Sequence, residues 1–240
     1  MKKSIALAFL GFLMFACSKN DTNATPVAKT CATCIRTPEA LVANDENVKG
    51  IYKGVVVGST GTVSINIQNG SNTITATLII DGVTALLTST VTPVNGESYT
   101  SPFTGTFNGT PISVNFSVGL GGATPTFTSS DIPGHPNATF EIFKETSTSL
   151  VEAFMGRYSR PGQTGVFNIV LSRGLSKWAG VARKDGGTET DKVRGTFNTT
   201  TNQIIEENTT VMGTISGDVL TGSFLDTNNN TITINGLRTL

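Results

Sequence analysis

Apolar and polar residues alternate along this 240-residue chain, and this feature constrains its fold most. Segments 62–68, 73–78 and 112–118 show the alternation without interruption. Because successive side chains of a β-strand point to opposite faces, such a segment buries one face of a sheet and exposes the other. Strands of a parallel sheet, covered on both faces, are instead apolar throughout. The pattern therefore predicts an antiparallel all-β protein.

Tight-turn signals separate the alternating segments. Asn-Gly or Asp-Gly pairs occur at positions 69–70, 81–82, 95–96 and 108–109. These pairs adopt the positive φ angles that two-residue hairpin turns require. The chain also has 26 glycines and only 14% charged residues, a composition that favours strands and turns over helices. We therefore expect a meander of short hairpins.

The second half of the sequence repeats features of the first. The Gly-x-x-Gly segment 58–61 corresponds to 162–165, and the Asp-Gly pair 81–82 corresponds to 185–186, both 104 residues later (165 − 61; 186 − 82). We expect two β units, 47–146 and 147–240, each of six or seven short strands. The residues expected to point into the interior are mostly Val, Ile, Ala and Gly. Side chains of this size fill a small barrel but leave a wide one hollow. Two tandem related small barrels or sandwiches are therefore the predicted fold, with one pseudo-twofold barrel or sandwich as the alternative.

The N-terminus is typical of an export signal. Lys2 and Lys3 precede an apolar run over 5–16, and Cys17 follows Ala16. This segment resembles a bacterial lipoprotein signal peptide, which implies that residues 1–16 are removed and that Cys17 is acylated. The residue after Cys17 is Ser18 and not Asp, so retention in the inner membrane is not indicated. The resemblance, which is Bacteroidota-like, implies anchoring in the outer membrane, on the periplasmic or the cell-surface side. Residues 17–46 are then expected to be a flexible tether.

Two further cysteines, Cys31 and Cys34, form a CxxC motif in this tether. Haem attachment requires a histidine directly after the second cysteine, but Ile35 stands there. A structural zinc site requires two further ligands, and the chain offers only one histidine besides the two cysteines. A thioredoxin-like site requires a βαβ unit, which the pattern does not contain. A local disulfide or two free thiols remain as interpretations. We predict no metal site and no cofactor.

The Gly-x-Tyr opening at 50–52, followed by a meander of hairpins, resembles the lipocalin and avidin type of up-and-down barrel. The resemblance covers residues 48–240 and concerns architecture, because no ligand motif of either family is present. Both families close a barrel of eight strands, whereas the units of this chain are expected to have fewer.

Three residues are candidates for ligand contact. His135, the only histidine, lies near Asp131 in a loop that the second unit lacks, and a carboxylate that orients an imidazole can create a general base. No Gly-x-Ser-x-Gly nucleophile motif accompanies it, and no catalytic residue is predicted. Trp178, the only tryptophan, is expected either to fill the core or to stack on a flat ligand such as a sugar.

Charge limits the partners that are expected. The 17 basic and 17 acidic residues balance, and no basic cluster lies beyond the signal peptide, so nucleic acid is not an expected partner. We expect a membrane contact through the lipid and a non-catalytic binding module for a carbohydrate, a small apolar molecule or an envelope partner. A passive structural lipoprotein is the alternative, and a hydrolase that uses His135 is the third hypothesis. The sequence does not determine the oligomeric state.

Overall fold

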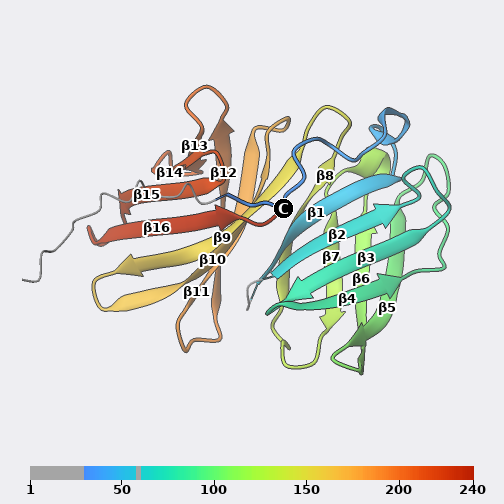
Figure 1. The fold of residues 1–240 in the computed structure, drawn as a ribbon, viewed down its shortest axis with the longest axis horizontal. Helices are drawn as coiled ribbons and strands as arrows, with labels where there is room; N and C mark the ends of the chain where they lie inside the picture. The colour runs from blue at the N-terminus through green and yellow to red at the C-terminus, as the bar shows by residue number, and fades with distance from the viewer. Residues whose placement is uncertain (1–29, 58–60) are drawn as a thin grey trace, which may run out of the picture.

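The computed structural model describes residues 30–57 and 61–240, which form two all-β units in tandem (Figure 1). Each unit is one antiparallel sheet of eight strands. The two sheets are separate, so the alternative of a single pseudo-twofold barrel is wrong. Cys17 and the predicted signal peptide lie outside the described residues.

The first unit is a nearly closed barrel. Its strands are β1 (Gly50–Val57), β2 (Gly61–Ile67), β3 (Ile74–Ile80), β4 (Val83–Thr88), β5 (Tyr99–Phe107), β6 (Thr110–Val118), β7 (Thr126–Asp131) and β8 (Thr139–Glu145). Strands β1 to β7 form a meander, and β8 returns to pair with β1. The rings of Phe127 in β7 and Phe140 in β8, with centroids 4.2 Å apart, cover the seam between those two strands.

The second unit is a closed barrel with the same meander. Its strands are β9 (Val151–Arg160), β10 (Gln163–Ser172), β11 (Lys177–Lys184), β12 (Thr190–Asn198), β13 (Gln203–Glu206), β14 (Val211–Ser216), β15 (Val219–Leu225) and β16 (Thr231–Arg238). Strand β9 pairs with both β10 and β16, which closes the sheet. Two single turns of 3₁₀ helix, Val42–Asn44 and Leu120–Gly122, lie outside the second barrel.

The expectation of six or seven strands in each unit is wrong, because each unit has eight. Two-residue turns such as 81–82 and 161–162 leave room for additional strands. Segments without clean alternation also pair in the sheets, among them β5, which contains Pro102, and the short β13. Eight is the usual strand number of small up-and-down barrels, so the lower number expected for these units is not found.

Glycines within strands allow the sheets to coil. A Cβ atom at Gly156, Gly195 or Gly222 would lie 1.9–2.0 Å from a carbonyl oxygen of the neighbouring strand. No side chain fits at such a distance, so neighbouring backbones approach closely only where glycine stands. Gly54 in the first unit has the same environment, at 2.1 Å from the Glu141 carbonyl oxygen. The high glycine content therefore serves barrel curvature as well as turns.

The two units contact each other through the outer faces of β1 and β8 on one side and of β9, β10 and β11 on the other. The centre of the interface is apolar and buried, and its members are Val55, Val151, Ala153, Val170 and Ala179, with Phe143 packed against them. The side-chain amide of Asn168 donates to the Val56 carbonyl oxygen at 2.7 Å across this interface. Strands β9 to β11 are therefore buried on both faces over much of their length.

The N-terminal segment, residues 30–48, lies along both units. Cys31 and Cys34 form a disulfide, and the Cys31 backbone N–H donates to the Asp218 carboxylate at 2.8 Å. Arg36 forms a bidentate ion pair with Asp218. Farther along, the Glu39 backbone N–H donates to Glu145 at 2.7 Å. The segment expected to be a flexible tether is thus bound to the barrels from Cys31 onward.

Candidate functional site

A cavity of about 430 Å³ opens at one end of the second barrel. Four connections surround this open end: β9–β10, β11–β12, β13–β14 and β15–β16. The β9–β10 and β15–β16 hairpins lie at the left of Figure 1, away from the first unit. Apolar side chains form the wall of the cavity, and they are Phe167, Ile169, Trp178, Ala182, Val193, Ile204, Met212, Leu220, Phe224, Ile232 and Ile234. A volume of this size is in the range of small-molecule sites.

Trp178 borders the cavity from β11 and is only 1% exposed. Its indole N–H donates to the Ile205 carbonyl oxygen at 3.0 Å. In the sheet Trp178 pairs with Gly195, which pairs in turn with Glu206 on the next strand. Trp178 is therefore buried and also lines the cavity, and its stacking on a flat ligand stays a prediction.

Two other aromatic rings of the cavity wall lie over glycines. A Cβ atom at Gly165 would lie 2.4 Å from the Tyr158 ring, and one at Gly236 would lie 2.8 Å from the Phe167 ring. Any larger residue at either glycine would push the ring away from the wall. The space inside the barrel therefore depends on a glycine of the neighbouring strand in the case of Tyr158 and on one far away in the sequence in the case of Phe167.

One side of the rim carries a connected polar chain. Arg160 donates to the Gln163 side-chain oxygen at 2.7 Å, and Gln163 donates to the Tyr158 hydroxyl at 2.7 Å. Arg160 also lies 3.4 Å from the Asp226 carboxylate. The pKa of Asp226 is lowered, chiefly because the Asn230 backbone N–H donates to its carboxylate. Arg160 and Asp226 together form a neutral pair at this side.

Two carboxylates, Asp191 on β12 and Glu206 on β13, line the other side of the rim. Strand β13 is four strands from β9 in either direction around the closed barrel, so Glu206 faces the Arg160 side across the opening. The side-chain amide of Asn208 donates to Glu206 at 2.8 Å. Within the described residues, no basic side chain forms an ion pair with Asp191 or Glu206.

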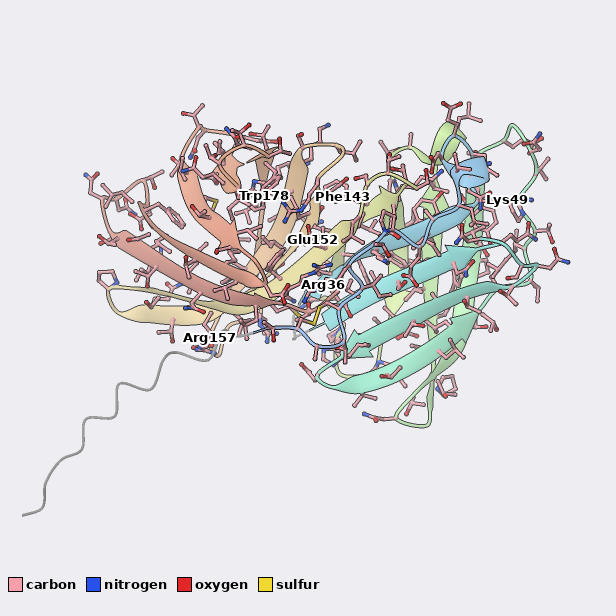
Figure 2. The ribbon with its side chains drawn as sticks, turned by 45° about the horizontal axis from the view of Figure 1, so that its top comes forward. Arg36, Lys49, Phe143, Glu152, Arg157 and Trp178 are labelled. Atoms are coloured by element: carbon pink, nitrogen blue, oxygen red, sulfur yellow. A yellow bond between two sulfur atoms is a disulfide. The ribbon has the colours of Figure 1, made fainter. Side chains whose placement is uncertain are left out.

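The opposite end of the second barrel is closed by buried charges. Arg238 and Glu152, 4% and 3% exposed, form an ion pair at 3.1 Å, and Arg173 also pairs with Glu152. Asp218 lies beside Arg238, and the hydrogen bond from Arg36 is the main reason that the pKa of Asp218 is lowered to about 2. Figure 2 shows Arg36 and Glu152 toward the centre of the molecule. The N-terminal segment is thus attached to the end opposite the cavity mouth.

His135 and Asp131 lie in the first unit and therefore form no common site with Trp178. His135 belongs to the β7–β8 connection, with its Nε2 3.6 Å from the Asp81 carboxylate and its ring edge-on to Phe107. Its side chain is 16% exposed, whereas Asp131 is exposed at the end of β7. The structure thus places Asp81, and not Asp131, beside the imidazole. The pair covers one end of the first barrel.

Side chains fill the interior of the first barrel. Tyr52, Phe103 and Phe116 are fully buried, and the Tyr52 hydroxyl donates to the Val48 carbonyl oxygen at 2.8 Å. Lys144 donates to backbone carbonyls of residues 44, 47 and 121, and burial lowers the pKa of Lys144 to about 8. The expected filled core is therefore found in this unit, whereas the second unit contains the open cavity.

Sequence reasoning did not identify Lys144 or the rim residues of the second barrel. A usable signal existed for the rim, because Asp191 stands in the same alternation phase as Val193 and so points inward. Across residues 30–57 and 61–240, no group of three or more His, Cys, Asp or Glu side chains is placed to hold a metal ion. No helix in the described part of the chain is long and apolar enough to cross a membrane.

Comparisons of this chain with protein-family models, with curated proteins and with solved structures find no match. The geometry of the two barrels is therefore the basis on which a function is inferred.

Proposed function

We propose that the protein is a non-catalytic binding module whose second barrel holds a small ligand with an apolar body. The open cavity of about 430 Å³ carries this proposal. An apolar wall with a few polar groups at the rim is the usual composition of a small-molecule site. Burial of an apolar ligand against this wall stabilises the complex by about 25 cal/mol per Å² of apolar surface removed from water, before the costs of association.

The contrast between the two barrels supports binding over a purely passive role. Both barrels have eight strands and the same meander, yet side chains fill only the first. An unfilled apolar interior costs stability, because wall atoms lose packing contacts. A ligand offsets this cost in the second barrel. The third hypothesis, hydrolysis at His135, gains no support from this cavity, since His135 belongs to the other unit.

Fluorescence of the single tryptophan tests the proposal, because Trp178 borders the cavity. We expect the neutral apolar probe N-phenyl-1-naphthylamine to quench Trp178 saturably. Ala182 lines the wall, so Ala182→Phe should fill the cavity and abolish this response. Ser223→Phe adds the same ring at an exposed position of β15 and should leave the response intact. Absence of saturable quenching, or equal quenching in both variants, would overturn the proposal.

We also propose, from the signal-peptide resemblance, that Cys17 is acylated and holds the module at the outer membrane. The contacts of Cys31 and Arg36 with Asp218 support an arrangement in which the chain reaches the barrel at its closed end. A lipid attached upstream would then leave the cavity mouth accessible. Cys17→Ser should move the protein out of the membrane fraction, and its retention there would contradict the anchor without bearing on ligand binding.

A further inference from the structure

The charges that line the cavity of the second barrel are unequal. One cation, Arg160, and three carboxylates, those of Asp191, Glu206 and Asp226, belong to the lining. All four lie at the open end, where the polar part of a bound amphiphile would come to rest. The balance of these charges bears on the head group that the cavity accepts.

Arg160 is already satisfied by the protein. It lies 3.4 Å from Asp226 and donates to Gln163 at 2.7 Å. Asp226 in turn accepts the backbone N–H groups of Asn228 and Asn230, both at 2.8 Å. The local network therefore uses the positive charge of Arg160, and an anionic head group would have to compete with Asp226 for it.

Asp191 and Glu206 differ from this pair, because no basic side chain among the described residues neutralises them. The nearest basic residues on β12, Lys192 and Arg194, alternate with the inward positions and are exposed. Lys192 pairs with Glu141 of the first unit at 3.3 Å. The two carboxylates therefore give one side of the mouth a net negative charge.

We infer that the ligand of this cavity is a cationic amphiphile, an apolar body that carries an amine, with the amine beside Asp191 and Glu206. The inference rests on the proposed function and specifies its ligand class. A carboxylate and an ammonium group attract each other more strongly next to an apolar wall than in bulk water. The same two carboxylates repel an anionic head group, so the site discriminates by attraction and by repulsion together.

Three ligands with one alkyl tail test this inference: decylamine, decanol and decanoate. Each competes with N-phenyl-1-naphthylamine for the full-length protein near neutral pH. We expect decylamine to bind about fivefold more tightly than decanol, which corresponds to about 1 kcal/mol for a partly exposed ion pair, and decanoate to bind most weakly. Glu206→Gln and Asp191→Asn should each lower the affinity for decylamine more than the affinity for decanol, and so reduce the preference for the amine.

Glu207→Gln is the matched control, because Glu207 is exposed and lies outside the cavity lining. It should leave all three affinities unchanged. Equal binding of decylamine and decanol, or tightest binding of decanoate, would overturn the cationic assignment while the binding function stands. Failure of all three, and of the naphthylamine probe itself, would overturn the proposed function as well.

Discussion

The interface between the two units provides a quantitative test of the architecture through Val170→Ala. Val170 lies on the outer face of β10, is fully buried, and packs with Val55 of the first unit. The substitution removes two methyl groups, worth about 1.6 kcal/mol of transfer free energy at about 0.8 kcal/mol each. The space left behind raises the expected loss to about 2–3 kcal/mol. For a chain of this length, that loss lowers Tm by about 4–12 °C.

Denaturant unfolding, followed by Trp178 fluorescence for the second unit and by far-UV circular dichroism for both, measures this loss. Val211→Ala is the control, because it removes the same two methyl groups at a position of the same barrel that is 41% exposed. The control should change the free energy of unfolding by no more than about 0.5 kcal/mol. Ligand affinity should be the same in both variants, since neither side chain lines the cavity. Equal stability of Val170→Ala and the control would show that the units do not pack through this face.

Two further perturbations test the closed end and the wall of the second barrel. The pKa of Asp218, lowered to about 2, predicts that the stabilisation from its Arg36 contact is present above about pH 4 and is lost as the pH falls toward 2. Because Arg36 is half exposed, solvent screens this contact and its contribution is small, but acid titration of stability should show the loss in the native protein and not in Asp218→Asn. Gly195→Ala would place a Cβ atom 1.9 Å from the Ile205 carbonyl oxygen, so β12 and β13 must separate. We expect a loss of about 3 kcal/mol or more and a change in Trp178 emission, against about 1 kcal/mol and unchanged emission for the turn variant Gly217→Ala.

Local patterns predict the strands of this protein well. Alternation over 62–68 and 112–118 coincides with β2 and β6, and the Asp-Gly pairs at 81–82 and 185–186 connect corresponding strands of the two meanders. The offset of the repeat does not persist, because 105–109 spans the β5–β6 turn whereas the similar segment 213–217 spans the β14–β15 turn. A Gly-rich turn is thus a local signal, and it does not fix which hairpin of the barrel it forms.

The cavity could not be predicted from the sequence, because it depends on contacts between residues far apart in the chain. The Phe167 ring lies over Gly236 of a strand that is not its neighbour in sequence, and Trp178 reaches the backbone of Ile205. The contact of His135 likewise comes from a separate hairpin, which contributes Asp81. Proximity in sequence to Asp131 suggested a different pair. Periodicity states which face a residue occupies, but it does not state which residues meet there.

The packing of the two barrels explains why one barrel tolerates an unfilled interior. One face of strands β9 to β11 lines the interior of the second barrel, and the other face packs against the first unit. Both faces of these strands are therefore buried over much of their length. The filled first barrel supplies the apolar partner for these strands. The Arg238–Glu152 pair closes the second barrel at the end opposite the cavity mouth. A wall supported in this way keeps its shape without side chains that cross the lumen. On the proposed binding function, the first barrel would serve to hold the second barrel open for its ligand.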